Sequence, residues 1–214
     1  MTTQVLLVRH GQSEWNALGR WQGQADPALT DLGREQAQLA AGSLGAIDAI
    51  FASDLQRAAE TALIISGALG VGPVVLEPGL RERDAGEWSG LTRAEIDEQY
   101  PGWLAPIADR SGFAPKLRAS PTDQRRPEGW EPDDSLLERT LAALQTIHGA
   151  VPGGEVVAVT HGGLIYTIEH HFGGDVHRLA NGGGRYITVD GDHLTLGERI
   201  LLVPDKAATV PKQI

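Results

Sequence analysis

The chain has 214 residues, no cysteine, and 18 Lys and Arg against 28 Asp and Glu, which gives a formal net charge of −10. An acidic chain lacks the broad cationic surface through which proteins bind nucleic acid or anionic membranes nonspecifically. The lack of cysteine excludes disulfides, thiolate nucleophiles and cysteine-ligated zinc.

A composition of 41% hydrophobic and 21% charged residues is typical of one globular domain, here residues 1–214. No apolar run approaches the roughly 20 residues that span a bilayer. Residues 1–4 also lack the basic start and apolar stretch of a signal peptide. We therefore expect a cytoplasmic protein with no membrane partner and no nucleic-acid partner.

The first segments of the chain predict a strand, a helix and a second strand. Residues 4–8 form an apolar run that stops at Arg9-His10-Gly11, which predicts a buried strand that enters a turn. Residues 30–44 are rich in Ala, Gln and Leu and begin with Thr30, a good cap, so we expect a helix there. The short apolar run 46–51 predicts the next strand.

Three pairs of residues stand at the spacing of a capping box, in which each side chain bonds to the other residue's backbone. Ser53 with Gln56 predicts a helix over 53–68 that has Arg57 in its first turn, and residues 74–77 predict a strand after it. The other two pairs, which begin helices towards residue 100 and over 136–148, are Thr92 with Glu95 and Ser135 with Glu138.

Residues 101–133 hold six prolines and few periodic apolar positions, so we interpret them as an irregular excursion that could cap a substrate site. This segment also carries a local basic cluster in an acidic chain: Lys116, Arg118, Arg125 and Arg126. One hypothesis is that some of these cations face the pocket and contact a polyanionic or sugar-phosphate substrate. A solvated charged loop is an equally good interpretation.

The last third of the chain repeats the opening pattern. Residues 155–160 form a β-branched run that ends in His161-Gly162-Gly163, and residues 164–172 suit a helix. Residues 185–202 contain two β-rich runs around Asp190-Gly191-Asp192, which predicts a hairpin. Strands that alternate with helices and end in a hairpin predict an α/β fold: a three-layer α/β/α sandwich whose central sheet is mostly parallel with an antiparallel edge.

Four side chains with phosphate-binding chemistry fall at strand ends or at a helix start. His10 and His161 each follow a predicted strand, Arg9 adjoins the first, and Arg57 lies at the start of a helix. In open α/β sheets, ligands collect beyond the carboxyl ends of the strands. Guanidinium groups bind phosphate oxygens in a bidentate manner, and one imidazole could act as a nucleophile. The sequence therefore predicts a phosphoryl-transfer pocket.

Phosphoryl transfer to an imidazole also needs an acid that protonates the leaving oxygen. Residues 80–90 offer three carboxylates, Glu82, Asp84 and Glu87. Their pattern alone does not choose among them.

Several motifs together resemble one known family. The segment 7–16, LVRHGQSEWN, looks like the signature of the histidine phosphatase superfamily in its phosphoglycerate-mutase-like branch. The resemblance continues in order and spacing to Leu164, through Gln22-Gly23, Ser53-Asp54-Leu55 with Arg57-Ala58, Leu80-Arg81-Glu82 and Val159-Thr160-His161-Gly162-Gly163.

The resemblance implies a role for each matching residue. His10 would be the phosphorylated nucleophile, and Arg9, Arg57 and His161 would hold the phosphate. Glu82 would donate the proton and then activate water, and no metal or organic cofactor would be needed. The remaining substrate contacts would come from Asn16, Gln22 and the backbone of Gly162.

The branch contains both phosphatases and cofactor-dependent mutases. The short chain and the segment 87–90, EWSG, look like the phosphatases, so we expect a phosphomonoesterase that hydrolyses a small phosphorylated metabolite. The alternatives are a phosphoglycerate mutase and a noncatalytic phospholigand-binding module. Asp133-Asp134-Ser135 stands where many phosphatases of this branch have Gly-Glu-Ser, which leaves the substrate range open. The resemblance also allows a homodimer.

Overall fold

The computed structural model describes residues 1–104, 125–174 and 177–211. Within them one six-stranded sheet has the order β3-β2-β4-β1-β5-β6. The first four of these strands pair in parallel, and β5 pairs antiparallel with β1 and β6, which confirms the predicted antiparallel edge. The strands are β1 (Thr3–Arg9), β2 (Ala49–Ala52), β3 (Val75–Leu76), β4 (Glu155–Thr160), β5 (Gly183–Asp190) and β6 (His193–Leu201).

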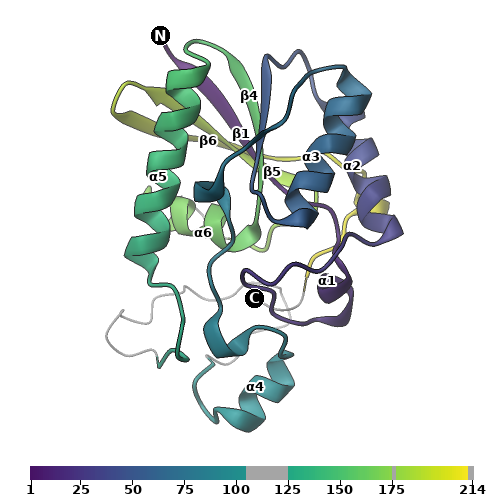
Figure 1. The fold of residues 1–214 in the computed structure, drawn as a ribbon, viewed down its shortest axis with the longest axis vertical. Helices are drawn as coiled ribbons and strands as arrows, with labels where there is room; N and C mark the ends of the chain where they lie inside the picture. Colours follow the sequence, from purple (N-terminus) through teal and green to yellow (C-terminus); the bar gives the residue numbers. More distant parts are fainter. Residues whose placement is uncertain (105–124, 175–176, 212–214) are drawn as a thin grey trace.

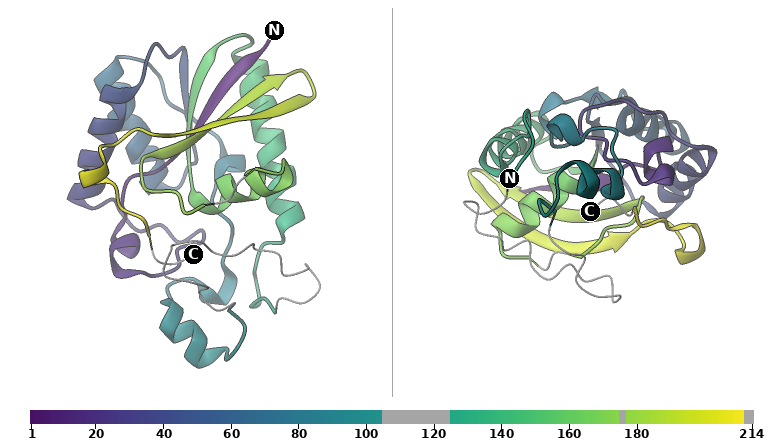
Figure 2. Two further views of the ribbon diagram at one scale, coloured as in Figure 1. Left: turned by 180° about the vertical axis from the view of Figure 1, so that it is seen from behind. Right: turned by 90° about the horizontal axis from the view of Figure 1, so that it is seen from below.

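Helices cover both faces of the sheet. Figure 1 shows α5 and α6 on one side of the strands and α2 and α3 on the other, and the view from behind in Figure 2 agrees. The predicted three layers are therefore present. The helices are α1 (Glu14–Leu18), α2 (Asp31–Ser43), α3 (Gln56–Leu69), α4 (Arg93–Gln99), α5 (Asp133–Ala150) and α6 (Gly162–His171), with short 3-10 turns η1 (Pro78–Leu80), η2 (Gly86–Trp88) and η3 (Asp205–Ala207).

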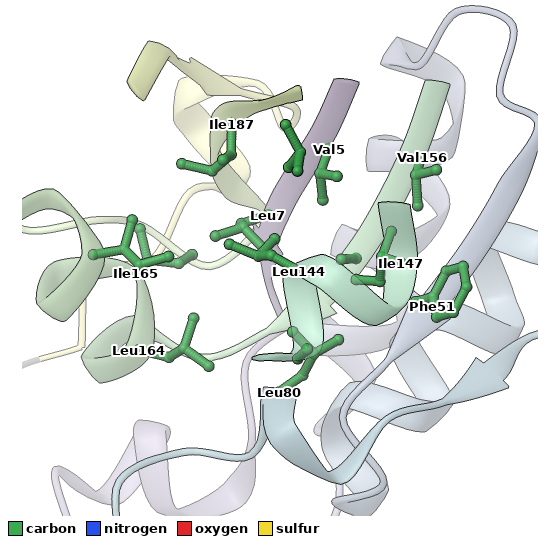
Figure 3. Packing of buried hydrophobic residues seen from close by; sticks show 14 of the residues in the cluster. Val5, Leu7, Phe51, Leu80, Leu144, Ile147, Val156, Leu164, Ile165 and Ile187 are labelled. Carbon is green, nitrogen blue, oxygen red and sulfur yellow. The ribbon is translucent and has the colours of Figure 1, made fainter. Parts of the chain in front are cut away.

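The residues of β1 alternate between two hydrophobic cores because successive side chains of a strand point to opposite faces. Val5 and Leu7 belong to the core beneath α5 and α6, where Leu144 and Leu164 pack (Figure 3). Leu6 and Val8 belong to the core beneath α2 and α3, which is completed by small or branched helix residues: Ala40, Ala41, Ala58, Ala62 and Ile65. The central strands are therefore buried on both faces, and this explains their continuous apolar runs.

The parallel strands bring three chain segments to one edge of the sheet. In Figure 1, β1 runs from the N-terminus towards the end of the sheet where α1 and α4 lie. β1 ends at Arg9, β2 at Ala52 and β4 at Thr160. The residues that follow, His10, Ser53 and His161, therefore start their loops at this same edge.

Two of the three predicted capping boxes are wrong. Helix α3 begins at Gln56, so its N-cap is Leu55, which has no polar side chain to cap the helix, and not Ser53, whose hydroxyl lies 2.9 Å from His161 Nε2. Helix α5 begins at Asp133 behind Pro132 and not at Ser135. Proline suits this boundary because it has no backbone N–H to satisfy.

Other predicted boundaries are confirmed. Thr30 accepts a bond from the Gly33 N–H and caps α2, and the Thr92–Glu95 capping box opens α4. The hairpin turns at Gly191, whose φ of 57° lies in the left-handed region. One further boundary differs from the prediction: helix α6 starts two residues earlier, directly after His161.

Most of the predicted excursion, residues 105–124, lies outside the described residues. In the part of the chain that is described, no helix is long and apolar enough to cross a lipid bilayer.

Candidate active site

One ring nitrogen of His10 contacts a backbone carbonyl, and the other faces the guanidinium group of Arg57. Its side chain is buried, and its Nδ1 lies 2.6 Å from the carbonyl oxygen of Gly11. A carbonyl only accepts hydrogen bonds, so Nδ1 carries the proton. Nε2 is then an unprotonated acceptor, and the Arg57 Nε–H donates to it at 3.3 Å. The lone pair of Nε2 therefore faces the guanidinium cluster.

Two buried guanidinium groups surround this imidazole. Arg57, in the first turn of α3, is fully buried and donates to the carbonyls of Ala25 and Gly23 at 2.7 and 2.9 Å. Arg9 donates to the Leu179 carbonyl at 2.6 Å, while its Nε is buried without a hydrogen-bond partner. Because a buried donor costs free energy when unpaired, this Nε is suited to an anionic ligand.

His161 lies edge-on to His10, with ring centroids 5.1 Å apart. Its Nε2 is 2.9 Å from the Ser53 hydroxyl oxygen, and its Nδ1 is buried without a partner. When the Ser53 hydroxyl donates to Nε2, Nδ1 carries the proton and offers it to a ligand. Ser53 also accepts from the Leu55 N–H at 3.3 Å, an orientation that leaves its own proton available for His161.

Burial and nearby cations keep both imidazoles neutral. Burial, reinforced by the charges of Arg57 and Arg9, lowers the pKa of His10 well below 6.5. Burial and the charge of Arg57 lower the pKa of His161 in the same direction. Burial also lowers the pKa of Arg57, to about 10, so this guanidinium stays charged at neutral pH. The site thus combines neutral imidazoles with fixed positive charge.

The structure separates the three candidate carboxylates. Glu82 Oε2 accepts the backbone N–H of Gly163 at 3.0 Å, so its carboxylate lies at the first turn of α6 beside His161. Asp84 accepts from the Gly86 N–H and closes its own turn. Glu87 is exposed and accepts from the Tyr100 hydroxyl. Only Glu82 among the three is hydrogen-bonded to the segment that carries His161.

Amide side chains lie next to the His10 backbone and the start of α1. Asn16, the third residue of α1, is 7% exposed and has a buried Nδ2 with no partner. Its Oδ1 accepts from Asn181 Nδ2, which also donates to the His10 carbonyl at 2.9 Å. Gln22 Oε1 accepts from the Ser13 hydroxyl at 2.6 Å. The orphaned Asn16 donor is therefore free for a ligand.

Glycines let the backbone approach these groups. A Cβ at Gly162 would lie 3.1 Å from the Arg9 guanidinium carbon, and one at Gly163 would lie 2.4 Å from Glu82 Oε1. The predicted site residues are thus brought together: His10, His161, Arg9, Arg57, Glu82, Asn16 and Gly162 share direct contacts or one intervening residue, with Gln22 linked through Ser13.

Sequence reasoning missed Ser53 and Asn181. Ser53 follows a buried strand directly, as His10 and His161 do, and this shared position could have identified it. Asn181 lies between Ala180 and Gly182 with no periodic signal, and only the tertiary fold brings it to the His10 carbonyl.

The basic cluster of the excursion is described only in part, because Lys116 and Arg118 lie outside the described residues. The Arg125 guanidinium lies 6.0 Å from the ring centroid of Trp103, and that of Arg126 lies 4.8 Å from Trp130. Each of these two cations therefore stacks on a tryptophan ring, and their contact with a substrate stays a hypothesis. Among the residues that the structure describes, no three His, Asp or Glu side chains are grouped to hold a metal ion.

Comparison with known proteins defines the class of this chain. Residues 5–183 match the model of the histidine phosphatase superfamily, branch 1. The chain belongs to this superfamily and is a histidine phosphatase.

Individual relatives are similar over most of their length. The metal-independent phosphoserine phosphatase of Arabidopsis thaliana is 37% identical over 169 residues, which are 78% of this chain and 67% of that protein. The glucosyl-3-phosphoglycerate phosphatase of Mycolicibacterium vanbaalenii is 41% identical over 165 residues, 75% of this chain and 70% of that protein. The structure of Bacillus stearothermophilus YhfR superposes with a TM-score of 0.76 at 29% identity, covering 91% of this chain and 95% of that one.

Proposed function

We propose that this protein is a metal-independent phosphomonoesterase that hydrolyses small phosphate esters through a phosphohistidine on Nε2 of His10. The observation that carries the proposal is the pair of contacts made by the two ring nitrogens of His10, from which its tautomer follows. Its Nδ1–H is bound to the Gly11 carbonyl, and its unprotonated Nε2 faces Arg57. A neutral imidazole with a directed lone pair is the form that attacks phosphorus.

In the first half-reaction the Nε2 lone pair forms a bond to phosphorus as the ester P–O bond breaks. The Glu82 carboxyl gives its proton to the leaving alkoxide, which departs as an alcohol. In the second half-reaction Glu82 takes a proton from water as the water oxygen attacks phosphorus. The N–P bond breaks, its electron pair returns to Nε2, and orthophosphate leaves. Glu82 ends protonated as it began, so the cycle closes.

The charges of the pocket suit a phosphoryl group that passes between the ester oxygen and His10. Arg9 and Arg57 would neutralise the equatorial oxygens, and preorganised donors of this kind stabilise the transition state without a metal. The buried donors that lack partners, Arg9 Nε and Asn16 Nδ2, would gain them from the phosphate. His161 would donate one further hydrogen bond from Nδ1.

We infer the substrate class from the relatives. The phosphoserine and glucosyl-3-phosphoglycerate phosphatases among the relatives support a small sugar phosphate or phosphoglycerate type of ester. Such metabolites are consistent with the cytoplasmic location, which stays a prediction.

The test is steady-state hydrolysis of a panel of phosphate esters by wild-type protein and His10→Ala, after treatment with a metal chelator. We expect the wild type to release orthophosphate and His10→Ala to lose at least about 10³-fold in kcat. His193→Ala, which removes an exposed imidazole from the start of β6, is the matched control and should keep full activity. Undiminished turnover by His10→Ala would reject the mechanism. Isomerisation of phosphoglycerates that exceeds hydrolysis, with catalytic bisphosphoglycerate present, would favour the mutase.

A further inference from the structure

Arg139, in the middle of α5, uses all five of its hydrogen-bond donors, three on the segment that carries Glu82 and two on the Glu131 carboxylate. A guanidinium group has five N–H donors. NH1 donates to the carbonyls of Gly79 and Arg81 at 2.9 and 2.7 Å, and NH2 donates to the carbonyl of Glu82 at 3.0 Å. The remaining two donors bind both oxygens of the Glu131 carboxylate at 2.7 and 2.8 Å. One side chain therefore fixes three carbonyls within four residues.

Arg139 does not bind the carbonyl of Leu80, which is bound by strand β4 instead. The Leu80 carbonyl accepts from the Thr160 hydroxyl at 2.8 Å, and Thr160 is the last residue of β4 before His161. The backbone of residues 79–82 is thus tied to α5 and to the strand end that carries His161. This leaves the main chain of Glu82 little freedom to move relative to the pocket.

Glu131 fixes the other flank of the same segment. Its Oε2 also accepts from the Asp84 N–H at 3.1 Å, and its carbonyl accepts from Arg83 NH1 at 2.7 Å. The Glu131 side chain is only 12% exposed and the Arg139 side chain 23%. A bidentate pair with this little exposure is geometrically specific and weakly screened.

We propose that Arg139 and Glu131 are positioning residues that hold the Glu82 carboxyl at the start of α6, where it protonates the leaving oxygen. The inference rests on the proposed function, because it assigns a structural cause to the placement of the proposed acid. The Glu82 side chain accepts a hydrogen bond from the Gly163 N–H. The position of its carboxyl group therefore depends on where the backbone of residues 79–84 is held. A shift of about 1 Å in a catalytic group can cost about 100-fold in rate.

A misplaced acid has an effect that depends on the leaving group. An alkyl phosphate releases a strongly basic alkoxide that needs the proton in the transition state, whereas a nitrophenyl phosphate releases a stable phenolate that does not. General disorder of the pocket would slow both esters by the same factor. The ratio of kcat/KM for the two esters therefore reports on the acid alone, and kcat/KM covers the first half-reaction.

The experiment measures kcat/KM for glycerol phosphate and para-nitrophenyl phosphate in the wild type and Arg139→Lys. Lysine keeps the charge but has at most three donors at one point, so it cannot span the three carbonyls and the carboxylate. We expect Arg139→Lys to lower kcat/KM for the alkyl ester by about 10- to 100-fold. The aryl ester should fall by no more than about threefold. In a Glu82→Gln background, Arg139→Lys should cause no further loss on the alkyl ester, because the two act as a unit.

Two further variants keep the test decisive. Arg199→Lys alters another guanidinium that is paired with a carboxylate, at Glu169 in the last turn of α6, and it should affect both esters equally. Glu131→Gln is isosteric and should show the same selective loss as Arg139→Lys, so it replaces that variant if the lysine disturbs folding. Equal losses on both esters, or additive losses with Glu82→Gln, would overturn the inference. If the wild type hydrolyses neither ester, the proposed function fails instead.

Discussion

At the scale of single residues, the site depends on keeping two imidazoles neutral in a cationic pocket. Burial removes water that would solvate an imidazolium, and the fixed charges of Arg9 and Arg57 oppose a further positive charge. Both effects lower the pKa of His10 and of His161. The arrangement therefore favours nucleophilic reactivity at neutral pH, but it lowers the stability of the folded protein in acid.

The lowered pKa values of the two imidazoles predict how the stability of the protein depends on pH. In the unfolded chain both imidazoles titrate near 6.5, whereas in the folded protein their pKa values are lowered, so the unfolded state takes up protons first. The stability that the two neutral imidazoles contribute is fully present above pH 6.5 and is lost as the pH falls towards their pKa values in the folded protein. Each group can remove about 1.4 kcal/mol per pH unit from the free energy of unfolding.

The measurement is urea unfolding over this pH range in buffer without phosphate, since a bound anion would stabilise the fold. His10→Asn should show a shallower acid slope than the wild type, by up to about 1.4 kcal/mol per pH unit. His193→Ala, at an exposed position, should leave the slope unchanged. An acid slope in His10→Asn equal to that of the wild type would show that His10 does not titrate in the way described.

Single residues also show where sequence reasoning is sufficient and where it fails. His10 and His161 could be identified because a buried strand ends directly before each of them. Ser53 has the same position, but Gln56 three residues later is equally typical of a capping box, and local spacing does not reveal that His161 lies across the sheet edge. Tertiary contacts decided this case against local propensity.

At the scale of elements, the turn after β1 is placed by a backbone contact with α2. A Cβ on Gly33 would lie 2.1 Å from the Gln12 carbonyl oxygen, and a Cβ on Gly11 would lie 2.3 Å from the Gly33 carbonyl oxygen. Real side chains do not pack this closely. Both glycines are therefore required by close approach, and the Gly11 carbonyl that binds His10 Nδ1 depends on this contact.

This contact predicts that two Gly→Ala substitutions in α2 change the stability of the protein in opposite directions. Gly42→Ala, at a position where a Cβ meets open space, should stabilise the protein by about 0.5 to 1 kcal/mol because alanine favours a helix. Gly33→Ala has the same helix preference but forces the backbone apart, so it should destabilise by about 1 to 3 kcal/mol. It should also lower kcat/KM by moving the Gly11 carbonyl. Urea unfolding of the two variants measures both changes. If Gly33→Ala stabilised the protein, the close backbone contact between Gly33 and Gln12 would not constrain this position.

Most elements could be predicted from periodicity and caps, but some boundaries could not. The sheet edge, the hairpin and the start of α2 follow from apolar runs, turn residues and Thr30. The start of α5 differs from the prediction because Ser135 with Glu138 has capping-box spacing, whereas the N-cap residue in the structure is Pro132. Arg139 lies on a helix where an arginine is ordinarily solvated, and only the packing of α5 against residues 79–82 reveals its five bonds.

At the scale of the whole molecule, a chain of net charge −10 is proposed to bind an anion. At physiological ionic strength, charges separated by more than about 8 Å are largely screened. Arg9 and Arg57 lie inside the protein next to His10, where screening is weak, so their local charge outweighs the global sum. Because the chain has no cysteine, the nucleophile proposed for this pocket is an imidazole and not a thiolate.

The most direct test of a phosphohistidine on His10 is to trap the covalent intermediate. Wild-type protein is mixed with a labelled phosphate ester, quenched in alkali, which preserves phosphohistidine, and digested for mass spectrometry. We expect one phosphoryl group on the peptide that contains His10, absent from His10→Ala and retained in His193→Ala. Label on another residue, or full turnover of the ester by His10→Ala without any phosphopeptide, would contradict it.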